Sequence, residues 1–230
     1  MNFKWMESLK RCRLFHSLGQ EEINCLLECL HPRIKSYQKN ECITIAGSEL
    51  TEFGILLSGE AAVTKENAAG SRIILTVLGP GELFGEIAAF SGNSCWPATV
   101  FAQGKCTALF LKPEKIIGYC DNSCENHKML IQNMLRIISE KALLLNRKVE
   151  YLAIKSLRGK ICTYLLEQHQ RTGMTTFMLP LKRWELADLL NVSRPSLSRE
   201  MCKMRDEGII DFHRSSIKIK NMEALKRNAE

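Results

Sequence analysis

One stretch near the C-terminus decides the fold: residues 183–208 read RWELADLLNVSRPSLSREMCKMRDEG. Its first half has one apolar face at helical spacing, formed by Leu186, Leu189 and Leu190. Ala187 is small enough to let a crossing helix approach closely, and Asn191 tolerates the left-handed backbone of a tight turn. The pattern therefore predicts two helices that cross at a turn near Asn191.

The second half begins with a helix start signal. Ser193 is a favourable N-cap, and Pro195 falls in the first turn, where its missing N–H costs little. The inner face carries Leu197, Met201 and Met204, whereas the outer face carries hydrogen-bond donors. This pattern predicts a helix-turn-helix whose second helix reads the major groove; an ordinary helical hairpin with a solvated basic face is the alternative. The expected DNA-binding residues are Arg183, Ser193, Arg194, Ser196, Ser198, Arg199 and Lys203.

Positive charge is concentrated in the same part of the chain. The 230 residues carry a net charge of +7. Residues 1–154 hold 17 Lys and Arg against 16 Asp and Glu, whereas residues 155–230 hold 15 against 9. A basic domain joined to a near-neutral one indicates contact with a polyanion, although a merely soluble basic surface is the alternative.

The flanking segments complete a C-terminal domain. Ser156 is a suitable N-cap for a helix over residues 157–168. Residues 212–219 alternate weakly around His213-Arg214-Ser215-Ser216, which predicts a two-stranded wing. We therefore expect a winged helix-turn-helix domain over residues 154–230.

A long helix precedes this domain. Its apolar residues follow spacings of four and three over three heptads: Ile131, Leu135, Ile138, Ala142, Leu145, Val149 and Leu152. Such a repeat keeps one seam facing a partner helix, so we expect a dimerisation helix over residues 124–153 and a parallel homodimer. A second stripe, through Met134, Ile137, Leu144 and Tyr151, indicates packing on the preceding domain. The alternative is a long core helix within a monomer.

Residues 1–123 are expected to form a sensory β-roll domain with N-terminal helices. Leu14, Leu18, Leu26 and Leu30 follow helical spacing, and Gly19 marks a break before a second helix. Short apolar or alternating runs then span residues 42–46, 53–57, 61–64, 73–78, 99–102 and 107–111. Turn signals separate these runs at about 8–12-residue spacing, which indicates a β-sandwich or roll.

Composition excludes several classes of protein. The 45% hydrophobic and 25% charged residues are globular averages, and no apolar run reaches the roughly 18–20 residues that cross a bilayer. The first 18 residues lack the apolar core of a signal peptide, so we expect a cytoplasmic protein. The ten cysteines are scattered without a Cys-x-x-Cys motif, and we interpret them as reduced, mostly buried thiols.

In this order, a β-roll, a long dimer helix and a winged helix-turn-helix resemble the cyclic-AMP receptor protein/FNR family of bacterial transcription regulators. The resemblance covers nearly everything from Leu14 to about Lys220. Its best-matched segments are residues 183–210 and GELFGEIAAF at 81–90, which is similar to the family's phosphate-binding segment. The glycines that match the family's corner positions are Gly47, Gly59, Gly70, Gly81 and Gly85.

The resemblance implies an α+β fold with three parts. These are an N-terminal double-stranded β-helix like that of cyclic-nucleotide-binding domains, the dimerisation helix, and the winged helix-turn-helix. It also implies double-stranded DNA with a palindromic operator, a second copy of the chain and RNA polymerase as partners.

The effector pocket implied by the resemblance departs from the family pattern. Nucleotide-binding members place an Arg-Ser pair where this chain has Trp96-Pro97, and no basic residue lies between Arg72 and Lys105. Because a buried phosphate without a counter-charge is strongly disfavoured, we expect that cyclic AMP is not the effector. Trp96 would instead be a stacking wall of a more apolar pocket. The pocket residues are Phe84, Gly85, Glu86, Ile87, Trp96, Pro97, Ala98 and Thr99.

The cysteine and histidine positions do not match a known effector site of the family. The FNR type holds an iron–sulfur cluster on tightly spaced cysteines, whereas here Cys12, Cys25, Cys29 and Cys42 are spread out. Cysteines four residues apart, as in the pairs Cys25/Cys29 and Cys120/Cys124, can share one face of a helix and bind a metal or form a redox disulfide. The simpler interpretation is that these spacings reflect packing or chance. Candidate haem ligands are His16, His31 and His127, and no spacing favours one of them. We therefore assign no cofactor and no metal site, and the effector stays unknown.

The reading helix also departs from the family. Members often have an acidic residue directly after the position of Arg194, where this chain has Pro195, so the half-site should differ from those of the cyclic-AMP receptor protein and FNR. Arg199 matches the family arginine that contacts guanine, and Ser198 precedes it as in FNR-like members. An arginine forked onto guanine O6 and N7 is the commonest specific base contact.

We therefore expect a homodimeric, sequence-specific transcription regulator without enzymatic activity. A small molecule or redox event in the roll would shift the two DNA-binding domains about a hinge near residues 153–156. One alternative is a constitutive DNA-binding regulator with no ligand. An alternative of another class is a thiol-based redox protein, but the sequence shows no recognisable nucleophile motif. A third alternative is a cyclic-nucleotide-binding regulatory subunit. Such a subunit would lack the helix-turn-helix and keep the arginine that binds the phosphate, whereas this chain has the motif and lacks the arginine.

Overall fold

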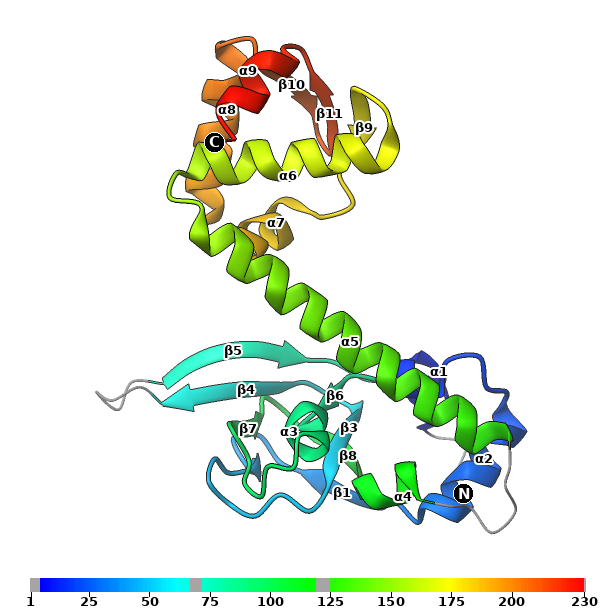
Figure 1. Cartoon of the computed structure of the whole chain (residues 1–230). Coiled ribbons are helices and arrows are strands. Elements are labelled where there is room, and N and C mark those ends of the chain that lie inside the picture. Colours follow the sequence, from blue (N-terminus) through cyan, green and yellow to red (C-terminus); the bar gives the residue numbers. More distant parts are fainter. Residues whose placement is uncertain (1–4, 67–71, 119–124, 230) are drawn as a thin grey trace. The chain divides into compact units, whose positions relative to one another are not determined.

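The computed structural model describes residues 5–66, 72–118 and 125–229. The chain divides into two compact units, Met1–Glu140 and Lys141–Glu230 (Figure 1). Gly70, Cys120 and Cys124, which the sequence singled out, lie outside the described residues. None of the described helices is both long enough and apolar enough to span a membrane.

The first unit begins with α1 (Met6–Arg11), a 3-10 turn η2 (Arg13–Phe15) and α2 (Gln20–Leu30). The predicted break at Gly19 is confirmed, because Gly19 is the N-cap of α2 and donates its backbone N–H to the Glu22 carboxylate at 2.6 Å. The inner faces of these helices are apolar and fully buried at Leu9, Leu14 and Leu26.

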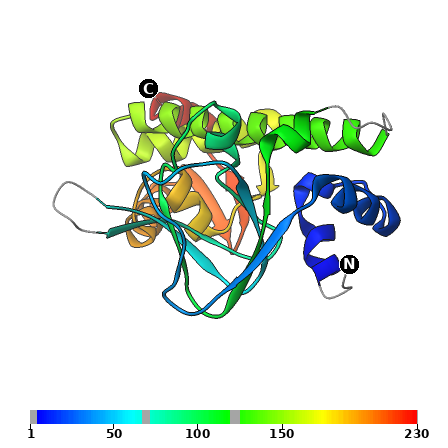
Figure 2. The same ribbon diagram turned by 90° about the horizontal axis from the view of Figure 1, so that it is seen from below.

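The roll consists of two four-stranded antiparallel sheets. The first has the order β1 (Arg33–Tyr37), β8 (Cys106–Leu111), β3 (Phe53–Ser58) and β6 (Leu83–Phe84). The second has the order β2 (Cys42–Thr44), β7 (Thr99–Ala102), β4 (Ala61–Glu66) and β5 (Arg72–Leu78). Short helices α3 (Glu86–Phe90) and α4 (Pro113–Ile117) follow β6 and β8. Figures 1 and 2 show α1 and α2 at one end of the roll and strands β4 and β5 projecting from the opposite end.

Two apolar clusters hold the first unit together. One fills the roll between its sheets and includes Leu56, Phe84 and Phe110. The other joins α1 and α2 to the roll and to the start of α5 (Glu125–Ala153). Burial of both faces of the first sheet explains why β3 and β8 are almost continuously apolar.

Helix α5 carries the two stripes that the sequence predicts. From the second stripe, Met134 and Ile137 are buried in the first unit and Tyr151 in the second, whereas Leu144 is 48% exposed. Most of the heptad seam is open: Leu135, Leu145, Val149 and Leu152 are 53–64% exposed in the single chain. Ile131 and Ile138 are half-buried, and Ile138 packs against the core of the first unit. The seam is therefore available to a partner helix.

The second unit has the order α6 (Leu157–Thr172), β9 (Thr176–Met178), α7 (Arg183–Leu189), α8 (Arg194–Asp206), β10 (Ile210–His213), β11 (Ser216–Ile219) and α9 (Met222–Arg227). The predicted N-cap of α6 is confirmed, because Ser156 Oγ accepts the Gly159 N–H at 2.8 Å. The wing is also confirmed as β10 and β11, to which β9 adds a third strand. The α+β fold class inferred from the sequence is correct.

Candidate functional site

The turn between α7 and α8 has the predicted geometry. Asn191 adopts a left-handed backbone with φ of 52°, and the Val192 N–H donates to the Ala187 carbonyl at 3.0 Å. Ser193 caps α8, because its Oγ accepts the Ser196 N–H at 3.2 Å and donates to Ser196 Oγ at 2.8 Å. Two of the predicted DNA-binding residues, Ser193 and Ser196, thus also build the start of the reading helix.

Helix α8 has one buried face and one open face. Leu197, Met201 and Met204 are completely buried in the core of the second unit. The side chains of Arg194, Ser198, Arg199 and Lys203 are exposed. At ~100° per residue, Arg199 lies almost directly opposite the buried face. The helix therefore offers a cationic row of donors to a ligand that approaches from outside.

Arg183 lies differently from the other predicted DNA-binding residues. It is only partly exposed, its guanidinium carbon lies 5.0 Å from the centre of the Phe212 ring, and it contacts the sulfur of Met201. Burial lowers the pKa of Arg183. Arg205 stacks on Phe212 as well, at 5.3 Å. Arg183 thus ties α7 to α8 and to the first strand of the wing.

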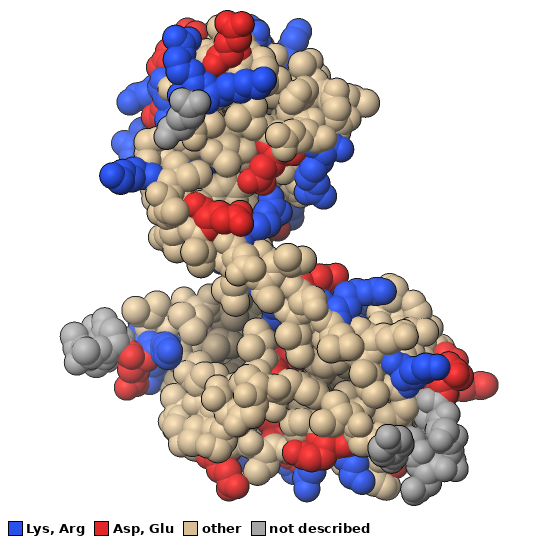
Figure 3. Space-filling view, viewed as in Figure 1, with Lys and Arg blue, Asp and Glu red and all other residues tan. Residues whose placement is uncertain are grey.

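The tip of the wing carries a further exposed cation, Arg214. His213 pairs with Ser216 across β10 and β11, which leaves Arg214 and Ser215 as a two-residue turn. Arg214 is exposed and adopts a left-handed backbone with φ of 54°. In Figure 3, several Lys and Arg side chains gather at the end of this unit that carries α8 and α9, with Asp and Glu side chains among them.

In the roll, Trp96 fills the corner where the family pattern would place a phosphate. The Trp96 side chain is 8% exposed, and its ring centre lies 6.0 Å from that of Phe84. The ring also lies over Gly85: a Cβ added to this glycine would be 2.3 Å from the indole. Gly85 has φ of 79°, so both its backbone and its contact with Trp96 require glycine. The corner residues therefore do not fit a cyclic phosphate.

The other predicted pocket residues are divided between the interior and the surface. Glu86 and Ala98 are buried, whereas Ile87 and Pro97 are exposed. Thr99 accepts the Ala46 N–H through its Oγ1 at 3.0 Å. The structure thus brings Phe84, Gly85 and Trp96 together and turns Ile87 outward.

A cleft of about 250 Å³ opens on another side of Trp96. Its walls include Trp96, Phe110 and Arg33, and the Arg33 guanidinium lies 4.3 Å from the centre of the Phe110 ring. Glu52 neutralises Arg33 through hydrogen bonds of 2.6 and 3.0 Å. Thr44, which is 8% exposed, also lines the cleft, and its Oγ1 has no hydrogen-bond partner. The cleft is mixed in polarity and large enough for a small molecule.

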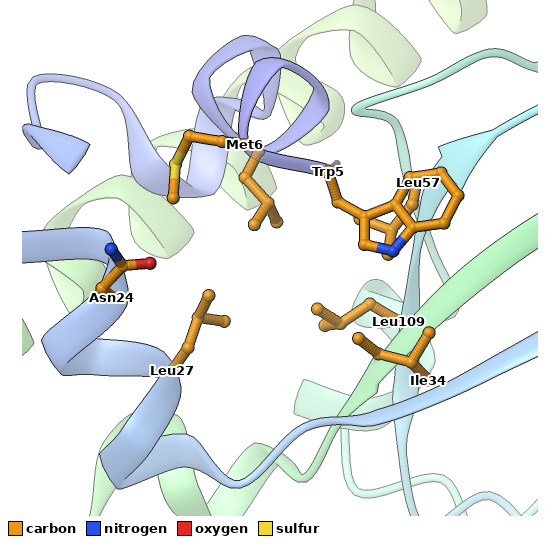
Figure 4. Close-up of a pocket in the computed structure, with 8 residues that line it drawn as sticks. Trp5, Met6, Asn24, Leu27, Ile34, Leu57 and Leu109 are labelled. Carbon is orange, nitrogen blue, oxygen red and sulfur yellow. The ribbon is translucent and has the colours of Figure 1, made fainter. Parts of the chain in front are cut away.

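A second, apolar cavity lies where α1 and α2 meet the roll. Figure 4 shows Met6 and Leu27 from the helices facing Leu57, Leu109 and Ile34 from the sheet. Its volume of about 20 Å³ suffices for about one water molecule. This cavity is therefore too small for an effector.

Two of the buried cysteines, Cys12 and Cys162, are poor candidates for a metal ligand or a redox thiol. Burial raises the pKa of Cys12 to about 12 and that of Cys162 to about 11, so both stay protonated thiols. His127 is buried and hydrogen-bonded to the Lys115 carbonyl oxygen at 2.9 Å. Within residues 5–66, 72–118 and 125–229, no three His, Cys, Asp or Glu side chains are grouped so that they could hold a metal ion.

Comparison with protein families divides the chain in the same way. Residues 34–123 match the cyclic nucleotide-binding domain family. Residues 159–228 match the Crp-like helix-turn-helix domain family. The two matches fall in the first and second units and include the Trp96 corner and helices α7 and α8.

Similar proteins align along nearly the whole chain. The cyclic AMP receptor protein of Thermus thermophilus is 24% identical over 229 residues, which are 96% of this chain and 98% of that protein. The CRP-like cAMP-activated global transcriptional regulator of Mycobacterium tuberculosis is 22% identical and covers 97% and 99%. The crystal structure of the Thermus thermophilus catabolite activator protein superposes with a TM-score of 0.54 at 22% identity, over 94% and 98% of the two chains. This likeness shows the fold.

Proposed function

The chain belongs to the CRP/FNR family of DNA-binding transcription regulators, and from that premise we propose that it binds a specific palindromic operator as a homodimer. Members of this family bind DNA through the helix-turn-helix and act as dimers; they are regulators and not enzymes. One observation carries the proposal: α8 is held by a fully buried apolar face and presents Arg199 on the opposite, open face.

The roles proposed for α8 follow from where its side chains lie. Arg199 donates two hydrogen bonds to guanine O6 and N7 in the major groove. Lys203, one turn further on, contacts a phosphate. Arg194, in the first turn, and Ser198 are further exposed donors, and the hydroxyl groups of Ser193 and Ser196 contact a backbone phosphate at the start of the helix. Arg183, whose guanidinium lies over the Phe212 ring, contacts a phosphate at the edge of the motif.

The proposed dimer uses the open seam of α5. Ile131, Leu135, Ile138, Ala142, Leu145, Val149 and Leu152 pack against the same residues of a second copy. Residues 1–123 then form the sensory domain, 124–153 the dimerisation helix and 154–230 the DNA-binding domain. RNA polymerase is the further partner that the resemblance to the family implies.

The signal proposed for the roll is a small molecule other than cyclic AMP, or a redox event. The Trp96 indole occupies the phosphate corner at Gly85, and the sequence has no Lys or Arg between Arg72 and Lys105 to neutralise a phosphate there. The cleft between Trp96 and Arg33 is the better place for a ligand. Since Arg33 is already paired with Glu52, that ligand would be uncharged or cationic.

The same observation favours a second candidate, a constitutive regulator. Because Trp96 fills the corner from within the chain, the corner is packed without a ligand. In that case DNA binding would be independent of small molecules and regulated by the abundance of the protein.

The proposal is tested by selecting DNA bound by the full-length protein from a random pool, under aerobic and under reducing conditions. We expect a palindrome with half-sites about 10–10.5 base pairs apart and a guanine in each half-site. Enrichment of the same operator with equal affinity in both conditions would favour the constitutive candidate over a redox signal. Failure to enrich any sequence would contradict the proposed function.

A further inference from the structure

Arg158, in the first turn of α6, joins this helix to α8 by three hydrogen bonds. Its Nε donates to a Glu200 carboxylate oxygen at 2.6 Å, and its Nη1 and Nη2 donate to the two Glu207 oxygens at 2.6 and 2.7 Å. The hydrogen bonds to Glu207 and Glu200 raise the pKa of Arg158, and Arg158 lowers the pKa of Glu207. The bidentate contact with Glu207 therefore joins two charged groups at neutral pH.

Glu200 in α8 and Glu207 at its C-cap lie on one flank of the helix. They are seven residues apart, which is about two helical turns, so a single guanidinium holds the helix at two levels. At ~100° per residue, this flank lies about 80–100° around the helix from Arg199. The planar guanidinium of Arg158 and the carboxylates of Glu200 and Glu207 form what we call the Arg158 fork. Any rotation of α8 that moves Arg199 sideways must therefore break the hydrogen bonds of this fork.

The same turn of α6 also contacts the other helix of the motif. Lys160, only 8% exposed, donates its Nζ to the carbonyl oxygen of Leu190 at the end of α7, at 3.2 Å. Gly159 between them has no room for a side chain, because a Cβ would lie 2.8 Å from Ser156 Oγ. The start of α6 thus contacts both helices of the helix-turn-helix.

We propose that Arg158 is a positioning residue for DNA recognition, which fixes the rotation of α8 and so directs Arg199 to its base. This inference rests on the proposed function of α8. The apolar contacts of Leu197, Met201 and Met204 hold α8 against the domain, whereas the fork sets its angle.

The test compares Arg158→Ala with Arg171→Ala, which removes the same charge from the exposed C-terminal end of α6. Both full-length variants are titrated with the operator selected by the wild-type protein and with a scrambled duplex. Both should bind scrambled DNA slightly and equally less well. Only Arg158→Ala should lower the operator-to-scrambled ratio, by about ten-fold, which corresponds to a coupling of about 1.4 kcal/mol. Equal ratios in the two variants would overturn the inference.

Two further variants separate positioning from stability. Arg158→Lys keeps the charge but lacks the fork, and Arg171→Lys is its matched control. Thermal unfolding followed by circular dichroism gives the stability of each. Arg158→Lys should keep the wild-type melting temperature but have a lower operator-to-scrambled ratio than the wild type. This variant therefore tests the positioning role even if Arg158→Ala unfolds. A wild-type ratio in Arg158→Lys contradicts the positioning role, whereas absence of any selected operator contradicts the proposed function itself.

Discussion

Replacing Trp96 with alanine should destabilise the first unit by about 3–5 kcal/mol. The side chain is 8% exposed and packs on Phe84 and Gly85. Burial of about 200 Å² of tryptophan surface, at about 25 cal/mol per Å², contributes about 5 kcal/mol. Truncation of a buried tryptophan to alanine costs ~3–5 kcal/mol in well-packed cores.

Amide hydrogen exchange read by mass spectrometry is the suitable assay, because it reports on the first unit separately. Peptides from β6 and β7 should lose most of their protection in Trp96→Ala. Trp184→Ala is the matched control, since Trp184 is 53% exposed and lies in the second unit. That variant should change stability by no more than about 0.5 kcal/mol and leave the roll unaffected.

One result would refute this reasoning. If Trp96→Ala kept wild-type protection throughout the roll, the indole would not be packed at Gly85 in solution. The corner would then be open, and the argument against a phosphate ligand would rest on the missing arginine alone.

Three further predictions concern assembly, ligand and thiols. Leu145→Glu places a charge in the α5 seam, so sedimentation at micromolar concentration should show monomers. An intact dimer would contradict the proposal that this seam forms the dimer interface. Calorimetry should detect no binding of cyclic AMP at micromolar ligand, and clear 1:1 binding per subunit would refute the account of the Trp96 corner. Brief alkylation at pH 8 should label the exposed Cys25 and Cys95 but not Cys12, whose pKa is about 12; rapid labelling of Cys12 would show that its burial is incomplete.

The helix-turn-helix could be predicted in detail because its signals are local. The cap at Ser193, the left-handed turn at Asn191 and the apolar spacing of α8 all act within a few residues, and each has the predicted geometry. Most strands of the roll were also predicted. The exceptions are β6, which has only two residues, and β1, whose first four residues are exposed and show no apolar alternation.

The contacts that set the site could not be predicted because they join distant residues. Arg158 is 42 residues from Glu200 and 49 from Glu207, and no local pattern relates the three. Arg183 is among the predicted DNA-binding residues, but its contact with Phe212 depends on the return of the wing to α7. Trp96 was expected as a pocket wall, and only the fold shows that it covers Gly85.

The central claim is that α8 reads DNA through Arg199, and a binding titration of Arg199→Ala tests it most directly. The operator selected by the wild-type protein and its single-base variants would be titrated at two salt concentrations. The account predicts a loss of roughly ten- to a hundred-fold on the operator, with preference relaxed at one guanine per half-site, since a forked arginine–guanine contact discriminates by ~1–3 kcal/mol. Lys203→Ala should instead weaken binding to all sequences about equally and reduce the salt slope by about one. Full base preference in Arg199→Ala would contradict the claim.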